Sequence, residues 1–219
     1  MIAEFEKMGR MSWFSHLDLQ STMQRALRRA DLPVRFSQGF NPHVNLSFAT
    51  ALSVGSESQC ELMDVELEGE VSPEDFVARL NACLPEGLQV HRACLVDDHA
   101  PALAARMVEA GYVVRVPGKD LSEPVQAFLD AAEVVVEKRS KKGTKPVNIR
   151  PMVHVLDCAF DGEGSTLHMI LEQTNANSLK AELLLQALGA GERYSCVRTG
   201  LYARGAQGER VELFEAARE

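Results

Sequence analysis

The chain has 219 residues, of which 46% are hydrophobic and 25% are charged, as is usual for a globular protein. Its formal net charge of −8 argues against a protein whose whole surface binds nucleic acid. No apolar run approaches the roughly 18 residues that span a bilayer, and the first residues show no secretory signal. We therefore expect one large or two small domains in the cytoplasm, without membrane contact.

Five cysteines are spread along the chain, and no two of them form a Cys-x-x-Cys pair. An odd number at wide spacing argues against a disulfide framework and against an iron–sulfur cluster bound by this chain alone. The GxxxxGK[ST], GxSxG and HExxH motifs are absent from the sequence as well. The sequence therefore predicts reduced thiols, no metal site and no self-sufficient metalloenzyme or nucleotide triphosphatase.

The first half of the chain predicts the order strand, helix, strand, strand, helix, strand. Residues 1–7 form a strand that continues through residues 11–14. A helix with a capping-box-like start follows at Ser15 and ends near Asp31, because Pro33 disfavours helix in the residue before it. The remaining elements are short strands at 34–36 and 45–49, an acidic strand at 61–69, a helix from Ser72 and a strand at 88–96.

The second half predicts a similar series. Its elements are a strand at 112–116, a helix at 124–132, strands at 133–139 and 147–160 joined by a turn, a strand at 166–172, a helix at 178–188 and a strand at 195–202. Two βαββαβ units in series predict an α+β protein with two tandem ferredoxin-like halves, each with an antiparallel sheet and helices on one face. We expect the halves to comprise residues 1–105 and 106–219.

Three local clusters of side chains are candidate functional sites, and the first is Ser15, His16 and Asp18. A helix N-terminus offers free N–H groups and a positive dipole end, which suit an anion such as phosphate. His16 would bind that anion or act as a general acid or base. The alternative is that Ser15 and Asp18 only cap the helix.

The second cluster is the loop at residues 37–43, SQGFNPH. Gly39 permits a positive φ and Asn41-Pro42 starts a turn. Phe40 would stack on a base, and Asn41 would hydrogen-bond to the polar edge of a base. His43 would pair with His16 across a cleft. The alternative is that Phe40 is a core plug and His43 a satisfied surface residue.

The third cluster is the predicted hairpin at residues 138–150, which holds six cations and no acid, whereas residues 51–110 hold twelve acids and three cations. A phosphate backbone is the natural partner of such a basic segment. The alternative is a solvated hairpin whose lysines prevent edge-to-edge strand pairing.

These motifs together resemble the radical-SAM-linked protein family, a bacterial domain of unknown function. In this sequence the matching elements are Lys7 and Gly9, Ser15 to Asp18, the arginines of the first helix, Gly39 to His43, Gly55 with Ser58, and the run from Lys141 to Pro151. The sequence departs from the family pattern where Val44 replaces a second proline and Asn148 replaces an aspartate.

The resemblance indicates which partners the protein has more clearly than which reaction, if any, it performs. Members of the family occur fused to, or encoded beside, radical SAM proteins of the cobalamin-binding kind. Such a partner would supply the iron–sulfur cluster and S-adenosylmethionine. Members of the family are also often encoded near ribonuclease and ribosomal-protein genes, and this gene context implies RNA modification or maturation.

Three hypotheses follow, in order of preference. The first is an accessory module that binds tRNA or rRNA and presents it to a radical SAM partner through Ser15, Arg25, Arg28, Arg29, Phe40, Asn41, Lys138, Arg139, Lys141, Lys142, Lys145 and Arg150. The second is an adaptor without RNA contact, which docks a basic protein on Asp64, Glu66 and Glu68. The third is a metal-independent RNA-processing enzyme that uses His16 and His43 as an acid–base pair oriented by Asp18.

Overall fold

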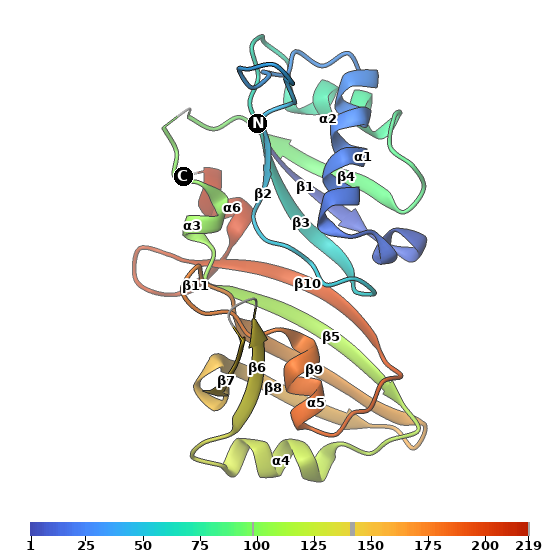
Figure 1. The fold of residues 1–219 in the computed structure, drawn as a ribbon, viewed down its shortest axis with the longest axis vertical. Coiled ribbons are helices and arrows are strands. Elements are labelled where there is room, and N and C mark those ends of the chain that lie inside the picture. The colour runs from blue at the N-terminus through green and yellow to red at the C-terminus, as the bar shows by residue number, and fades with distance from the viewer. Residues whose placement is uncertain (98, 141–142, 219) are drawn as a thin grey trace. The chain divides into compact units, whose positions relative to one another are not determined.

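The computed structural model describes residues 1–97, 99–140 and 143–218 of the protein. Within these residues it is a mixed α+β protein with six α-helices and mostly antiparallel strands (Figure 1). The chain divides into two compact units, of which the first comprises Met1–Met107 with Leu201–Glu219 and the second comprises Val108–Gly200. None of the described helices is long and apolar enough to cross a membrane.

The first unit begins with a strand–helix–strand–strand–helix–strand series. Its elements are β1 (Ile2–Lys7), the 3-10 helix η1 (Gly9–Trp13), α1 (His16–Arg29), β2 (Leu46–Phe48), β3 (Glu57–Val65), α2 (Pro73–Asn81), β4 (Leu88–Cys94) and the short α3 (Leu103–Arg106). Strand β1 pairs antiparallel with both β3 and β4, and β2 pairs antiparallel with β3. The resulting strand order is β4-β1-β3-β2.

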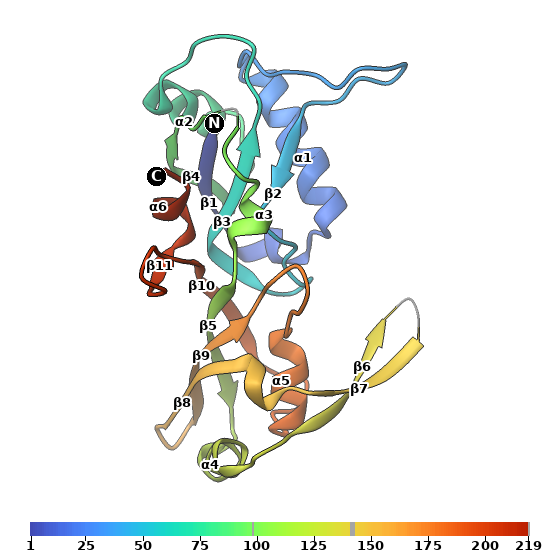
Figure 2. The same cartoon turned by 90° about the vertical axis from the view of Figure 1, so that its left-hand side faces the viewer.

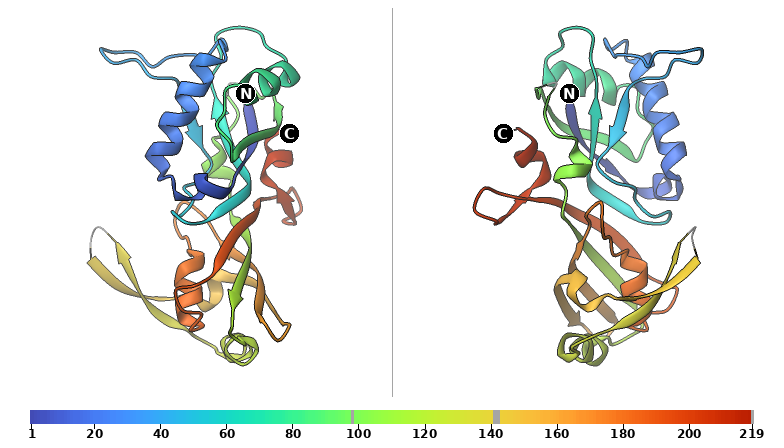
Figure 3. Two further views of the ribbon diagram at one scale, coloured as in Figure 1. Left: turned by 90° about the vertical axis from the view of Figure 1, so that its right-hand side faces the viewer. Right: turned by 60° about the vertical axis from the view of Figure 1, so that its left-hand side comes forward.

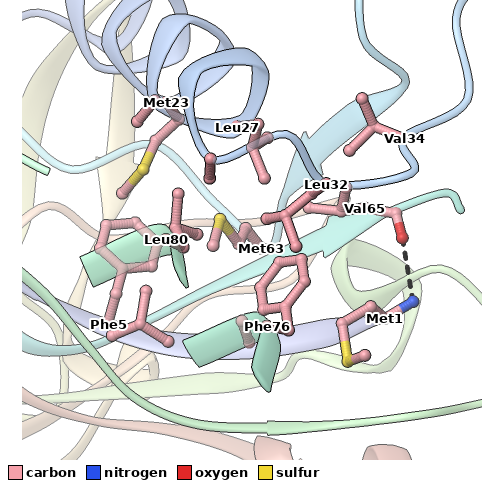
Figure 4. Close-up of a cluster of buried hydrophobic side chains, with 14 of the residues drawn as sticks. Met1, Phe5, Met23, Leu27, Leu32, Val34, Met63, Val65, Phe76 and Leu80 are labelled. Atoms are coloured by element: carbon pink, nitrogen blue, oxygen red, sulfur yellow. Dashed lines mark hydrogen bonds between the residues drawn. The ribbon is translucent and has the colours of Figure 1, made fainter. Parts of the chain in front are cut away.

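Both long helices of this unit pack on the same face of its sheet. Apolar residues recur at helical spacing in α1 and include the fully buried Met23 and Leu27. Figure 4 shows them above Phe5 and Met63 of the strands, in one buried cluster that also contains Phe76 of α2. Burial of each such side chain contributes about 1.5–3 kcal/mol. This core fixes α1, and therefore fixes where the segments before and after α1 emerge.

Residues 11–14 do not extend β1 as expected, because the chain folds back at Gly9, whose φ is +56°, and forms η1. The buried ammonium group of Lys7 stabilises this turn. It donates hydrogen bonds to the carbonyl oxygens of Ser12 and Phe14, both at 3.1 Å. A buried lysine needs such partners, and the carbonyls of an extended strand would point elsewhere.

The last residues of the chain belong to the first unit, whereas the sequence grouped them with residues 106–200. Strand β10 (Ser195–Arg204) leads into β11 (Arg210–Glu212) and α6 (Leu213–Arg218). The guanidinium group of Arg92 in β4 donates to Glu4, Glu212 and Glu215 and lies 4.1 Å from the ring centroid of Phe214. This charge network attaches α6 to the first sheet, and no local sequence pattern reveals it.

The second unit contains β5 (Glu109–Pro117), α4 (Ser122–Asp130), β6 (Val135–Ser140), β7 (Gly143–Asn148), the 3-10 helix η2 (Arg150–Met152), β8 (Val153–Phe160), β9 (Gly164–Glu172), α5 (Ala181–Ala187) and the first part of β10. Strand β9 pairs antiparallel with both β5 and β8, and β10 lies on the other side of β5. Strands β6 and β7 form a separate hairpin (Figure 3).

The predicted strand at 147–160 is therefore divided. Residues 147–148 end β7, and β8 begins only at Val153. Pro151 lies between them in η2, and a proline cannot donate the ladder hydrogen bond that a continuous strand would need.

Candidate nucleic-acid interface

The Ser15–Asp18 motif forms the N-terminal cap of α1. The hydroxyl oxygen of Ser15 accepts a hydrogen bond from the amide of Asp18 at 3.3 Å, and the Asp18 carboxylate accepts from the Ser15 amide at 3.1 Å and from its hydroxyl at 2.6 Å. These hydrogen bonds hold the pKa of Asp18 below its usual value. The predicted capping box is confirmed, and both side chains are engaged in it.

His16 is exposed beside this cap. Its imidazole packs edge-on against Phe48 of β2, with 5.4 Å between the ring centroids. The contact joins the first turn of α1 to the end of β2.

Residues 35–45, which we call the finger, form a narrow β-like hairpin between α1 and β2. Phe36 and Val44 form an antiparallel bridge. On either side of it, the Ser37 amide donates to the His43 carbonyl at 2.8 Å and the Asn45 amide donates to the Arg35 carbonyl at 2.9 Å. Figure 2 shows this segment projecting away from the sheet of the first unit.

Phe40 is at the tip of the finger and is fully exposed. Gly39, with a φ of +128°, provides the sharp turn beside it. The alternative that Phe40 plugs the core is therefore wrong. An aromatic ring that a folded hairpin holds entirely in solvent is available to stack on a ligand.

His43 is at the base of the tip, and its role is at least partly structural. Its Nδ1 shares a hydrogen bond of 3.0 Å with the hydroxyl of Ser37, and its amide donates to the same hydroxyl oxygen at 3.1 Å. His43 also lines a recess of about 310 Å³, together with Gln20, Asn45, Ser47, Asp64 and Glu66.

The arginines of α1 lie on its exposed face, and one of them, Arg28, contacts the finger. Arg28 donates to the Pro42 carbonyl at 3.4 Å, and its guanidinium carbon lies 5.2 Å from the ring centroid of Phe36. Arg29 donates to the Cys83 carbonyl, and Arg25 donates to the Thr22 hydroxyl at 3.3 Å. A guanidinium group has five N–H donors, so each retains capacity for a phosphate.

The finger and the Ser15–Asp18 cap lie at opposite ends of α1. Arg28, which contacts the finger, follows His16 by twelve residues, which corresponds to about 18 Å along the helix axis. The expected pairing of His16 with His43 across a cleft is therefore not observed.

The other motifs of the sequence gather at the N-terminal end of α1. The Gly9 amide donates to the Glu57 carboxylate at 2.8 Å, and the Gly55 amide donates to the Ser12 carbonyl at 2.9 Å. These contacts make the Lys7–Gly9 and Gly55–Ser58 motifs structural. Two exposed apolar side chains at this end, Trp13 and Leu17, were not among the sequence-predicted site residues, and residues 11–14 were expected to form a strand.

In the basic hairpin, the described cations differ in their surroundings. Lys145 is exposed, whereas the ammonium group of Lys138 donates to the Ser178 carbonyl at 2.6 Å. Arg150 donates to the Leu129 carbonyl at 3.1 Å and lies over the ring of Phe128. Arg139 pairs with Thr144 in the hairpin register, and the predicted Lys141 and Lys142 lie outside the described residues.

Asn148, which replaces the aspartate found in the radical-SAM-linked protein family, forms structural hydrogen bonds in this protein. Its side-chain oxygen accepts hydrogen bonds from the amides of Val134 at 3.0 Å and Arg150 at 3.1 Å. These bonds join the start of β6 to the end of β7.

The five cysteines are free thiols. Among the residues that the structure describes, no group of three or more His, Cys, Asp or Glu side chains is arranged to hold a metal ion.

Comparison with known structures shows a distant likeness in fold. A chain of the "Crystal Structure of a Cbf5-Nop10-Gar1 Complex" is 12% identical, with a TM-score of 0.51, and the match covers 91% of this chain and 48% of that chain. This protein thus spans about half of the length of that neighbour. A second match is the "Crystal Structure of an Unknown Protein from Galdieria sulphuraria", at 13% identity and a TM-score of 0.25, covering 90% of this chain and 96% of that one.

A search among curated proteins finds no match to this sequence. The profile of one protein family, described as "Uncharacterized protein conserved in bacteria (DUF2344)", matches residues 1–181. The chain therefore belongs to this family of uncharacterized bacterial proteins.

Proposed function

We propose that this protein is a non-catalytic accessory module that binds RNA, tRNA or rRNA, and presents it to a radical SAM partner for modification or maturation. The observation that carries the proposal is the full exposure of Phe40 at the tip of a finger that Arg28 contacts and whose base contains Arg35. A rigid aromatic tip beside cations combines base stacking with phosphate attraction.

The RNA that suits such a tip is single-stranded. Bases in a duplex are stacked on each other, whereas unpaired bases in loops or ends are free to stack on an aromatic ring. The recess at the finger base offers the carboxylates of Asp64 and Glu66, which accept hydrogen bonds from the amino groups of bases but repel phosphates. Asn41, next to the tip, would read a base edge.

The basic hairpin would provide the second contact. Lys145 is exposed there, while Lys138 and Arg150 hold the hairpin and the end of β7 in place. In this proposal the hairpin follows the phosphate backbone without reading sequence.

The proposed scaffold is a pair of ferredoxin-like units. The first unit has the strand order β4-β1-β3-β2. The second has the corresponding order β10-β5-β9-β8, with the β6–β7 hairpin inserted after α4. The proposal that the partner is a radical SAM protein, which would bring its own iron–sulfur cluster and S-adenosylmethionine in the cytoplasm, rests on the family resemblance and is an inference from association.

A catalytic role for His16 and His43 has less support. Proton transfer between an acid and a base at one phosphodiester requires both rings within reach of the same group. The imidazole of His16 packs on Phe48 and that of His43 bonds to Ser37, and the described residues show no contact between the two rings.

The experiment that tests the proposal is ultraviolet crosslinking and sequencing of RNA bound to the protein in bacterial cells, with Phe40→Ala and Phe160→Ala compared. Phe160 is a partly exposed phenylalanine in the second unit and serves as the matched control. Loss of one stacked base costs about 1–3 kcal/mol, so Phe40→Ala should weaken binding roughly 5- to 150-fold and Phe160→Ala should not.

Purified protein and an unpaired RNA oligonucleotide then give the affinity by fluorescence anisotropy, which should fall as salt is raised. Absence of enriched RNA in cells together with equal, weak binding of both variants would refute RNA binding.

A further inference from the structure

The first unit contains a second open groove, of about 710 Å³, at the end of the sheet where β1 begins. It lies between the chain that leaves β3, residues 66–72, and the chain that leaves β4, residues 95–97 and 100–101. Its volume is within the range of about 300–1,000 Å³ that is typical of ligand sites. Its described lining residues include neither Phe40 nor a residue of the basic hairpin.

Part of this groove is apolar. Leu67 and Val71 line it and are packed on the buried core of the unit, so this part of the surface is held in place. Leu95 stands at its edge with 62% of its surface exposed. Leu67, Val71 and Leu95 thus give the groove apolar surface that aliphatic side chains of a ligand would remove from water.

The remaining lining is mainly acidic. Asp64, Glu66, Glu70 and Asp97 all face the groove, and Arg35 is the cationic side chain among its described lining residues. Arg35 is already paired with Glu66 at 3.4 Å, and the Met1 ammonium group lies 4.0 Å from Asp64. The carboxylates that remain would repel the phosphates of RNA and attract a cationic ligand.

We propose that this groove docks a cationic polypeptide segment of a protein partner, in which lysine or arginine alternates with aliphatic residues. The aliphatic residues, and the methylene stems of the cations, pack on Leu67, Val71 and Leu95. The ammonium or guanidinium groups bind Glu70 and Asp97. The groove adjoins the finger: Arg35 lines it, and Asp64 and Glu66 line both the groove and the recess at the finger base, whereas Phe40 at the finger tip is not among its described lining residues.

The test uses a fluorescein-labelled peptide that alternates lysine with leucine, carries a photoactivatable group and is titrated into the full chain at low salt. The protein is tagged after residue 219, because Met1 lines the groove. Glu70→Lys reverses an exposed charge of the groove, and Leu95→Ser removes its exposed aliphatic edge. Glu192→Lys and Val135→Ser make the same changes at exposed positions of the second unit.

The expected result is that Glu70→Lys weakens peptide binding about tenfold and Leu95→Ser weakens it severalfold, while the two control variants bind as the natural protein does. Crosslinks should map to residues 64–72 and 95–101. A peptide that alternates glutamate with leucine should not bind.

The proposal is overturned if Glu192→Lys weakens binding as much as Glu70→Lys, if crosslinks fall elsewhere, or if RNA occupies the groove and displaces the peptide. Thermal melting of each variant checks that the fold is retained. Because the readout is a peptide and not RNA, failure here leaves the crosslinking test of Phe40 unaffected.

Discussion

The guanidinium carbon of Arg28 lies 5.2 Å from the ring centroid of Phe36, and the same side chain donates a hydrogen bond to the Pro42 carbonyl. One residue of α1 therefore touches both strands of the finger. The buried core fixes the position of α1, and the two contacts of Arg28 in turn hold the segment that carries Phe40.

Arg28→Leu should loosen the finger without unfolding the unit. Loss of the cation–π contact and the hydrogen bond would speed hydrogen exchange at the Ser37 and Asn45 amides about fivefold, equivalent to about 1 kcal/mol. Exchange monitored by mass spectrometry checks this. Arg25→Leu, on the same exposed helix face, is the control, and equal acceleration in both variants would contradict the assignment.

Ser15→Ala should destabilise the protein by about 1 kcal/mol, because the Asp18 amide at the start of α1 loses its acceptor. Ser15→Thr retains a hydroxyl group and should stay close to the natural protein. Urea unfolding gives both free energies. If Ser15→Ala binds RNA more weakly under conditions in which the variant is still folded, the Ser15–Asp18 cap also contacts the RNA.

Arg92→Met should release α6, because three carboxylates, Glu4, Glu212 and Glu215, would then lie together without their shared cation. We expect a loss of about 1–2 kcal/mol, since the partly exposed network is screened by solvent. Limited proteolysis should detect earlier cleavage after residue 204. Arg218→Met, which removes an exposed partner of Glu215 alone, should have little effect.

Asp161→Asn should reveal an acid-dependent contribution to stability. The Arg115 guanidinium, which donates to Asp161 at 3.0 Å, and the amides of Glu163 and Gly164 lower the pKa of Asp161 from 3.8 to about 2. A carboxyl whose folded pKa is depressed stabilises the fold above its ordinary pKa, and the contribution disappears as the pH falls through about 2.

The melting temperatures of the natural protein and Asp161→Asn should therefore differ near neutral pH and converge between about pH 4 and pH 2. Asp130→Asn is the control. A difference that stays constant down to pH 2 would show that the charge of Asp161 is not responsible.

Asn148→Asp should be tolerated and Asn148→Ala should not. Both Asn and Asp offer an oxygen to the Val134 and Arg150 amides, whereas Ala leaves these donors unpaired at a cost of about 1–3 kcal/mol. Urea unfolding measures the two changes. An equal loss of stability in both variants would mean that the side-chain NH₂ group of Asn148 is required as well as its oxygen.

Local sequence patterns predicted several elements correctly. The Ser72-Pro73 start of α2 and the capping box of α1 depend on neighbouring residues only, so they could be read directly. The charge of the residues 138–150 was equally visible. In the same way Gly39 and Pro42 indicated a turn, although they did not indicate that the turn is the tip of a projecting finger.

By itself, the sequence determined the helix starts, the turns and the position of charge along the chain, because each depends on spacing within a few residues. Tertiary structure alone decided that Phe40 is in solvent, that the finger and the Ser15–Asp18 cap lie at opposite ends of α1, and that Arg92 attaches α6 to the first unit. It also created the acidic groove beside Leu95. Such relationships join residues that are far apart in the chain, and packing of the core sets the distances between them.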